Sequence, residues 1–451
     1  MKQSSDGTHI GVNRRSFLKG TGAAGIVGLA GCLGGDGGDG GDGGSGGDGG
    51  SGSSGGSTGG GTGNPLKVGA LYALSGSIEV IGRPMMNSTE LAVNQINENG
   101  GIDGRQIELV KRDNGSDPAT GVEESRSLVN DENCSIVFSA YTSAMRNAIT
   151  PTYVQNEVPL WYPTLYEGGV CTNIEGGEGF SGDINVPKES LEWVWFNNAV
   201  PKQQIQPYIP WLMEEEDIES IYLIGSDYVW PQTTNAVLKN FVDENDGTIV
   251  GEDYVPLGFT DWGSKLTDIQ NADPDAVYFT VVGSSMVAMI EQAAELGLTD
   301  QQTWAGNIMT EQEANSAGSA ADGIYTSAPY FTSIESEANT NYLSSYEESY
   351  GTDTTPNFVA EASYWAPLMM RQLLEENNPE VSSGPEMKTA LENETEITAP
   401  QGPVSMQPGS HHCTIQSRAG QYNADASEFD VLQEFGQISP GGITVDGECL
   451  L

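Results

Sequence analysis

Aromatic rings and hydroxyl groups follow several of the apolar runs that predict strands in this chain. Tyr141-Thr142-Ser143 comes directly after one such run, and Tyr162 to Tyr166 follows the next. Tyr228 and Trp230 stand in the same relation to a third run, and Gly283 follows a fourth. Rings stack against flat molecules, while hydroxyls and backbone amides orient them through neutral hydrogen bonds. These residue types therefore predict non-covalent capture of a small, uncharged molecule.

The strand-end loops supply almost no cations, whereas a bound amino acid needs partners for both its ammonium and its carboxylate group. The candidate ligand-binding residues are Tyr141, Thr142, Ser143, Tyr162, Pro163, Thr164, Tyr166, Tyr228, Trp230, Val282 and Gly283. A second tier consists of Ser75, Glu167 and Asp227. A structural alternative stays open for part of this set. Ser143 and Thr164 have the chemistry of helix caps, Glu167 and Asp227 can fix loop amides, and Tyr228 can pack against Trp230 between lobes without a ligand.

No set of residues in the chain predicts catalysis. The three histidines are His9, His411 and His412, and none lies in a strand-end loop. The G-x-G-x-x-G match at Gly20–Gly25 has no strand before it and lies in the N-terminal signal, so it lacks the context of a dinucleotide site. His411-His412-Cys413 has no second ligand cluster, and the neighbouring glycine and serine predict a loop there. We expect no catalytic residue, no cofactor and no metal.

Strands and helices alternate twice along the chain, which predicts an α/β fold with two doubly wound, mostly parallel sheet lobes. In the first half, strands at 67–73, 106–110 and 134–139 alternate with helices at 84–97 and 119–131. In the second half, strands are expected at 220–224, 248–250 and 276–282, with helices at 232–245, 262–271 and 285–296. Ligands of such sheets gather beyond the carboxyl ends of the strands, where the rings and hydroxyls stand.

Residues 1–32 have the pattern of an export signal. Arg14-Arg15 precedes a small-residue apolar stretch at 20–31 and resembles a twin-arginine signal, and Leu29-Ala30-Gly31-Cys32 resembles a lipobox. The stretch is shorter than the roughly 20 residues of a membrane-spanning helix, although an uncleaved anchor helix is the alternative. We expect export of the folded chain and attachment to the outer face of the cell membrane through lipid on Cys32.

A tether and an acidic surface complete the organisation. Residues 33–64 are nearly all Gly, Ser and Asp, and such a coil spans roughly 30 Å, enough to let a folded body reach a permease. The whole chain has 18 basic and 63 acidic residues and a net charge of −45. This charge repels nucleic acid and anionic membrane surfaces. We interpret it as a surface adapted to very high salt, where charges are screened within about 3 Å.

The strand-end loops resemble those of the type I periplasmic-binding-protein superfamily, in its branched-chain amino-acid receptor class. The likeness runs from residue 66 to about 436 and is greatest to the urea-binding subunits of ABC importers and the short-chain-amide sensor of amidase operons. The matching blocks are 141–146, 162–168, 225–231, 280–283, 328–331, 360–365 and 399–404.

The resemblance implies that the ligand lies between two lobes joined by several crossovers. Lobe one would comprise 65–198 and 330–385, and lobe two 199–329 and 386–451. Tyr141 to Ser143 and Tyr162 to Thr164 would form the lobe-one wall, and the candidates from Tyr228 onward would come from lobe two. Two residues depart from the pattern of the resembling proteins: Trp230 stands where they often have Tyr, and Leu165 where they often have Pro or Gln. The Gly- and acid-rich segment at 170–192 is an insertion that they lack.

The function implied is a solute-binding lipoprotein that delivers urea or a short-chain amide to the permease subunits of an ABC importer. A receptor for branched-chain or other neutral amino acids is one alternative. A ligand sensor not coupled to transport is another, and a surface adhesin or structural lipoprotein is a third.

Four cysteines remain beside Cys32, and in an oxidising compartment they allow two disulfides. Cys134 begins a predicted strand and is expected to be a buried thiol. Cys171 has Cys413 and Cys449 as possible partners, and the sequence does not choose between them. The triplets at Asn87, Asn114 and Asn393 match the glycosylation pattern but are short enough to occur by chance.

Overall fold

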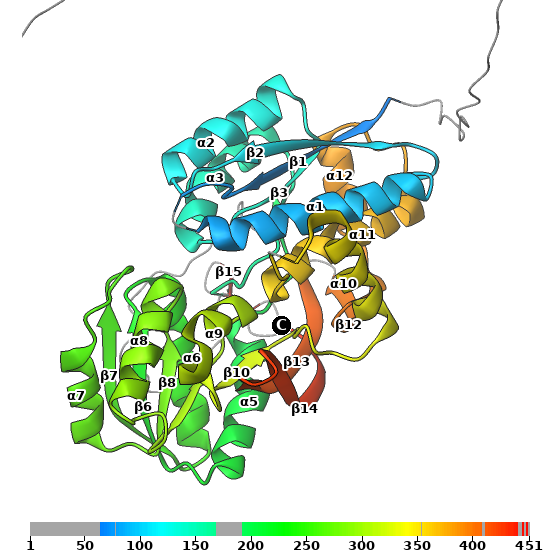
Figure 1. Ribbon diagram of the computed structural model, residues 1–451. Coiled ribbons are helices and arrows are strands. Elements are labelled where there is room, and N and C mark those ends of the chain that lie inside the picture. The colour runs from blue at the N-terminus through cyan, green and yellow to red at the C-terminus, as the bar shows by residue number, and fades with distance from the viewer. Residues whose placement is uncertain are drawn as a thin grey trace, which may run out of the picture. The chain divides into compact units, whose positions relative to one another are not determined.

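Two groups of parallel strands, separated by colour in Figure 1, form the framework of the computed structural model. The structure describes residues 64–76, 78–167, 192–352, 354–407 and 411–440, and the backbone of the short strands β15 (Thr444–Val445) and β16 (Glu448–Cys449). The predicted export signal, Cys32, most of the tether and Cys171 lie outside the described residues. So does all of the extra acidic segment except its last residue.

The first strand group has the order β2-β1-β3-β4-β5, and every neighbouring pair is parallel. Its strands are β1 (Leu66–Tyr72), β2 (Ile107–Asp113), β3 (Ile136–Ser139), β4 (Leu160–Tyr162) and β5 (Val194–Phe196). The helices between them are α1 (Glu79–Glu98), α2 (Pro118–Arg126) and α3 (Ser143–Asn156), with a π-helical turn at Ser127–Asp131 after α2. α1 begins five residues before the predicted helix at 84–97, and Pro84 lies inside it.

The second strand group has the order β10-β9-β8-β6-β7, again parallel throughout. Its strands are β6 (Ser220–Ser226), β7 (Thr248–Val255), β8 (Ala276–Thr280), β9 (Thr303–Gly306) and β10 (Tyr325–Ala328). The helices are α5 (Pro201–Glu215), α6 (Val229–Glu244), α7 (Gly263–Ala272), α8 (Ser284–Glu295) and α9 (Glu311–Ala317), with a 3-10 turn at Gly318–Ala321. The strand predicted to reach residue 282 ends at Thr280, so Val282 and Gly283 lie in the loop before α8.

The C-terminal part of the chain adds elements to both strand groups. These are α10 (Glu337–Tyr350), α11 (Phe358–Asn377), α12 (Gly384–Leu391), β11 (Thr395–Ala399), β12 (Gly402–Gln407), β13 (His412–Asn423) and β14 (Glu428–Ile438). The first residues of β13 pair with β12 and β5, and its second half pairs with β10. β13 therefore joins the two groups into one 14-stranded sheet. His412 and Cys413 belong to this strand, so the loop predicted there ends at His411.

This alternation of parallel strands and helices confirms the predicted α/β class. Tyr162, Tyr166 and Phe196 are fully buried within one core cluster beside β3, β4 and α3. Tyr208, Leu223 and Tyr278 are buried in another between α5, β6 and β8. Both cores place rigid strands beneath the loops that carry the candidate residues. The predicted lobe boundaries stay a prediction.

Among the described residues, no helix combines the length and the apolar character needed to cross a bilayer.

Candidate functional site

The loop after β3 is held in a strained turn directly before the first candidate residue. Ala140 has a positive φ of 76°, which side-chain-bearing residues rarely adopt. The Thr142 hydroxyl accepts a hydrogen bond from the Met145 amide at 3.2 Å and caps α3. Tyr141, between these two positions, is half-buried and packs against a further cluster of buried residues that includes Phe138 and Trp161. The backbone of Tyr141 is thus fixed by the turn before it and by the helix cap after it.

The loop after β4 is tied back to the loop after β3 by three hydrogen bonds. Thr164 Oγ1 donates to the Ala140 carbonyl at 3.0 Å, and the Tyr162 hydroxyl donates to the Tyr141 carbonyl at 2.7 Å. Ser143 Oγ donates to Glu167 Oε2 at 2.8 Å. These hydroxyls hold the two loops to each other. Neither Ser143 nor Thr164 is the helix cap that the structural alternative predicted, because Thr142 occupies the N-cap position of α3.

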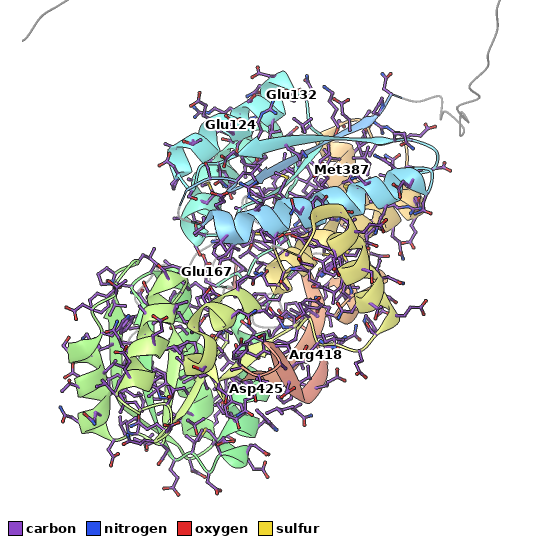
Figure 2. All side chains as sticks on the ribbon, viewed as in Figure 1. Glu124, Glu132, Glu167, Met387, Arg418 and Asp425 are labelled. Carbon is purple, nitrogen blue, oxygen red and sulfur yellow. The ribbon has the colours of Figure 1, made fainter. Side chains whose placement is uncertain are left out.

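A buried ion pair between Arg146 and Glu167 lies under this double loop (Figure 2 labels Glu167). The two side chains are 5% and 3% exposed, so the pair is shielded from solvent. Arg146 Nη1 donates to Glu167 Oε2 at 3.2 Å, and Nη2 donates to Oε1. Burial disfavours the charged carboxylate, but Arg146 outweighs this effect and the pKa of Glu167 is lowered.

Aromatic rings enclose the same guanidinium group. Its carbon lies 4.6 Å from the centroid of the Tyr166 ring and 5.2 Å from that of Tyr162. Tyr166 also stacks on Phe196 with centroids 4.1 Å apart. Pro163, which follows Tyr162 in the sequence, is buried as well. The positive charge of Arg146 is therefore compensated by Glu167 and covered by rings.

The candidate residues of the second strand group are held by fewer contacts. Tyr228 occupies the N-cap position of α6 and is half-buried. Trp230 is buried, and its indole N–H has no hydrogen-bond partner among the described residues. The Val282 amide donates to Ser226 Oγ at 3.3 Å. Gly283 has φ +62° and open space where a side chain would begin, so its backbone is accessible at the start of α8.

Glu313 is a site residue that the sequence reasoning missed. It lies on α9, is 8% exposed, and accepts hydrogen bonds from the Thr310 amide at 3.0 Å and from the Thr310 hydroxyl. The Gly283 backbone is close enough to this carboxylate to lower its pKa in part. Burial is the main reason that the pKa of Glu313 is raised. The pattern Thr310-x-x-Glu313 after β9 is a capping box at a strand end, and the strand-end rule applied to β9 would have found it.

Electrostatic coupling connects the two sets of loops. The pKa of Tyr141 is raised well above its usual value by burial and then by Glu313, Tyr228 and Tyr162. The pKa of Tyr228 is raised by burial and then by Tyr162 and Glu167. Because such coupling requires proximity, the structure brings these three tyrosines together with the two carboxylates.

Two second-tier candidates have local structural partners. Ser75 is exposed in the turn after β1, and its hydroxyl donates to Asp113 Oδ2 at 2.6 Å. Asp227 is exposed and accepts from Gln232 Nε2 at 2.9 Å, in the first turn of α6. Both bonds fix loop geometry, and no contact described here joins either residue to the tyrosines.

With this geometry in view, comparison with known proteins gives a decisive match. A family model described as "Periplasmic binding protein" matches residues 65–427. The chain belongs to the periplasmic binding protein family. This confirms the resemblance at the level of family and fold, and the narrower likeness to urea- and amide-binding members stays a prediction.

Individual relatives of this periplasmic binding protein are distant. Leu/Ile/Val-binding protein homolog 7 of Brucella melitensis is 25% identical over 232 residues, which cover 51% of this chain and 56% of that protein. The leucine-specific-binding protein of Salmonella typhimurium is 21% identical over 60% of this chain and 69% of its own length. The chain thus spans little more than half the length of the first of these relatives.

Solved structures share the fold of this periplasmic binding protein. A solute binding protein of an ABC transporter from R. palustris, in complex with benzoate, has a TM-score of 0.71 at 20% identity. It covers 86% of this chain and all of its own length. The branched-chain amino acid transporter substrate binding protein LivJ from Streptococcus pneumoniae, in complex with isoleucine, has a TM-score of 0.67 at 21% identity and covers 83% and 99%.

The cysteines and histidines of the described part form no metal centre. Cys134 and Cys413 are free and buried, which confirms the buried thiol predicted at Cys134 and leaves Cys413 without a disulfide. His411 stacks on Trp195 and His412 on Phe196, with centroids 4.0 and 4.5 Å apart. Within residues 64–440, as far as they are described, no cluster of three metal-ligating His, Cys, Asp or Glu side chains occurs.

Proposed function

We propose that this periplasmic binding protein is the solute-binding receptor of an ABC importer, and that it captures urea or a short-chain amide between its two lobes. The ligand would be delivered to permease subunits after closure of the lobes. Capture without chemical change accounts for a site composed of phenols, amides and a carboxylate.

The observation that carries this proposal is the compensated charge of Arg146. It is the one basic residue within 140–146, 162–167 and 226–231, the described stretches that carry Tyr141, Tyr162 and Tyr228. Its guanidinium is already bound by Glu167 and enclosed by Tyr162 and Tyr166. A ligand carboxylate would find no free cation in these described stretches and would approach Glu313 and Glu167, whose negative charges repel it.

An uncharged amide fits the remaining groups. Its N–H groups can donate to the Glu313 carboxylate, and its carbonyl can accept from the Tyr141 or Tyr228 hydroxyl. Its flat face can stack on the phenol rings. The raised pKa values of Tyr141 and Tyr228 keep both phenols protonated, and therefore able to donate, at every physiological pH.

Isothermal titration in molar salt tests the proposal with urea, acetamide, formamide and leucine. We expect saturable heat with urea or at least one amide and none with benzoate, whose carboxylate lacks a cation here. Binding of leucine, with no heat of binding for urea or either amide, would contradict the choice of ligand.

A receptor for a neutral amino acid is the second candidate. Two observations favour it: relatives carry names such as Leu/Ile/Val-binding and leucine-specific-binding protein, and Glu313 offers a carboxylate for an ammonium group. The ligand carboxylate would then have to rely on backbone amides and hydroxyls alone. The leucine arm of the same titration distinguishes this candidate from the amide receptor.

We further propose that the receptor is exported by the twin-arginine route and held at the outer face of the cell membrane by lipid on Cys32. The sequence of signal, lipobox and Gly-rich tether supports this placement. Fractionation of cells that express Cys32→Ser should move the protein from the membrane into the soluble extracytoplasmic or culture fraction. A variant that still partitions wholly with membranes would contradict the lipid anchor.

A further inference from the structure

A single strand, β13, passes from one strand group to the other and is irregular where it does so. His412 pairs with Phe196 of β5, whereas Arg418 pairs with Ala328, the last residue of β10. The register with β14 shifts between Ser417 and Arg418 and again between Ala419 and Gly420. Such irregularities bend a strand and re-aim its side chains. Arg418 thus lies at the bend that joins the two groups.

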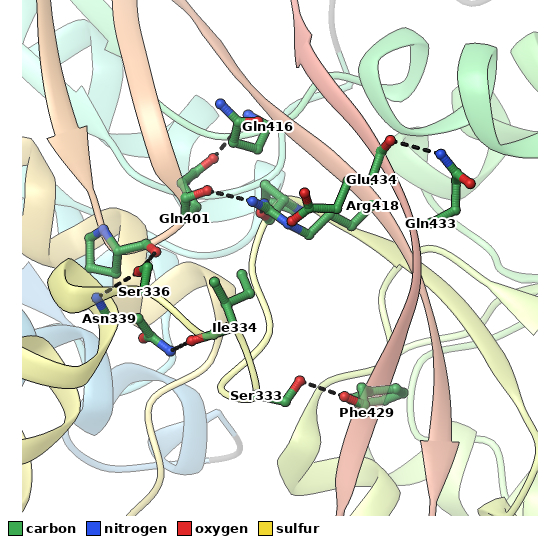
Figure 3. Close-up of polar contacts among 12 residues, drawn as sticks. Ser333, Ile334, Ser336, Asn339, Gln401, Gln416, Arg418, Phe429, Gln433 and Glu434 are labelled. Atoms are coloured by element: carbon green, nitrogen blue, oxygen red, sulfur yellow. Dashed lines mark hydrogen bonds and ion pairs between the residues drawn. The ribbon is translucent and has the colours of Figure 1, made fainter.

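The Arg418 side chain is buried and donates to three different segments. Figure 3 labels two of its partners, Gln401 and Glu434. Nη1 donates to the Pro329 carbonyl, at the start of the crossover from β10 to α10. Nη2 donates to the Gln401 carbonyl at 2.7 Å, in the turn between β11 and β12. Nε donates to Glu434 Oε1 at 3.0 Å, across the strand pair on β14. One guanidinium therefore links three segments.

Gln401 extends this contact to helix α11, whose N-terminal half packs beside α1. The Gln401 amide donates to Glu361 Oε1 at 3.1 Å, and its side-chain Nε2 donates to Oε2 at 2.9 Å. Its Oε1 accepts from the Gln416 amide at 3.1 Å, two residues before Arg418. Glu361 is fully buried, and desolvation raises its pKa to about 8. Removing its amide partners would therefore leave a buried polar group without compensation.

The crossover at 329–336 is fixed along its whole length rather than hanging free. Glu311 Oε1 accepts from the Thr332 amide at 2.9 Å, and the Ser333 hydroxyl donates to the Phe429 carbonyl of β14. Asn339 Nδ2 donates to the Ile334 carbonyl at 2.7 Å, and the Ser336 hydroxyl donates to the Pro400 carbonyl at 3.4 Å. Arg418 contacts this fixed crossover at Pro329 and the β11–β12 turn at Gln401, so it links both segments at the bend of β13.

We propose that Arg418 is a positioning residue for ligand capture, because its bonds to Pro329 and Gln401 hold the crossover and the β11–β12 turn at one fixed pivot. The inference rests on the proposed function, in which two hinged lobes close on a solute. Arg418 touches no candidate ligand-binding residue in any contact described above. Arg418 therefore affects binding by changing the fraction of molecules whose two lobes are arranged so that they can close on a ligand.

This mechanism predicts a loss of affinity that is the same for every ligand. When only a fraction of molecules has the binding-competent arrangement, every apparent dissociation constant is divided by that fraction. A pocket residue, in contrast, changes the affinities of chemically different ligands by different factors. Uniformity of the loss is the readout that separates a pivot from a contact.

The test compares Arg418→Met, which keeps the apolar stem, with Glu434→Gln as matched control. Glu434 is 65% exposed and contributes only the solvent-facing bond to Arg418, so its loss should leave both other bonds intact. A second variant, Arg418→Lys, keeps the buried positive charge but lacks the planar fork that bonds both carbonyls at once, and guards against unfolding. Thermal unfolding in molar salt verifies that each variant is folded.

Titration with whichever of acetamide, urea and leucine binds the wild type should show about tenfold weaker binding for both Arg418 variants, by the same factor for each ligand. Glu434→Gln should stay within about twofold of the wild type. Small-angle scattering without ligand should show a broader distribution of radii of gyration for the Arg418 variants. Unchanged affinity with an unchanged distribution would overturn the proposal, as would a loss confined to one ligand.

The scattering comparison also separates this inference from the proposed function. Should the wild type bind none of the solutes, the proposed function fails, but a broadened distribution for Arg418→Met would still support the pivot. Should the wild type bind as expected and both measurements stay unchanged in the variant, the pivot alone fails.

Discussion

The loops beyond the two strand groups differ in how firmly they are held. Those after β3 and β4 are joined by the Arg146–Glu167 pair and by hydrogen bonds from Ser143, Thr164 and Tyr162. Those after β6 and β8 carry a half-buried Tyr228, an indole N–H without a partner among the described residues, and an open Gly283. The first set is pre-organised by these cross-loop bonds, although its Tyr166 hydroxyl also lacks a partner among the described residues, whereas fewer described bonds hold the second set.

The difference assigns distinct tasks to the two sets. A rigid surface lowers the entropy lost when a ligand first binds, because its side chains are already ordered. An incompletely satisfied surface gains its contacts only when the lobes close, and this differential gain is what drives closure. Substitutions in the first set should thus reduce stability, and those in the second should reduce affinity.

The largest expected effect is on stability, from Glu167→Gln. This change leaves the buried guanidinium of Arg146 without its counter-charge, which typically costs about 3–5 kcal/mol. Denaturant unfolding in molar salt measures the loss. Glu375→Gln, which breaks the partly exposed i,i+4 pair with Arg371, is the control and should cost less than about 1 kcal/mol. Equal losses for the two variants would remove the distinction between the loops.

The same ion pair predicts the direction of the pH dependence. The pKa of Glu167 is lower in the folded chain than its ordinary value. Its contribution to stability is therefore complete above the unfolded value of about 4.3 and is lost as the pH falls toward the lowered folded value. Glu167→Gln should flatten this part of the stability curve, and a wild-type curve that is equally flat there would contradict the assignment.

Tyr228→Ala should reduce affinity more than stability. A ring that closes over the ligand acts as a binding hot spot, so we expect a loss of at least about 2 kcal/mol, or roughly thirtyfold in the dissociation constant. Because Tyr228 is only half-buried, the thermal midpoint should change little. Titration and thermal unfolding of the same sample distinguish the outcomes, and a large drop in midpoint with unchanged affinity would reverse the comparison.

Glu313→Gln should have a smaller, pH-dependent effect on affinity. The ionised carboxylate accepts an N–H bond from the ligand more strongly than the protonated acid does. Because burial raises the pKa of Glu313, wild-type affinity should fall as the pH drops toward this raised value. The variant should bind about tenfold more weakly at neutral pH and show a flat profile. A profile in Glu313→Gln that still falls like that of the wild type would exclude Glu313 as the titrating group.

The smallest effect is expected from Asp227→Asn. Its exposed carboxylate contacts Gln232, and an amide oxygen can accept the same hydrogen bond. Stability and affinity should both change by less than about 0.5 kcal/mol. A larger loss of affinity would move Asp227 from a loop anchor into the binding surface.

The strand-end rule selects most of the candidate residues from the sequence, and their role in ligand binding stays a prediction. Strands and helices can be predicted from the apolar pattern because their side-chain periods differ. The residues after the strands are then expected to lie together, because the carboxyl ends of parallel strands meet at one edge of the sheet. Tyr141, Tyr162 and Tyr228 were found in this way. Glu313 was missed because its loop after β9 contains no ring, and a capping box is normally interpreted as local structure.

The sequence by itself determined the α/β class, the positions of the strand-end loops and the small number of basic residues in them, since these follow from local periodicity and composition. Only the tertiary structure decided that Arg146 pairs with Glu167, that Gly283 lies near Glu313, and that β13 serves both strand groups. These contacts depend on strand order and on side chains far apart in the chain. Local propensity carries no information about such pairings, because they form only when the sheet brings separate loops to the same edge.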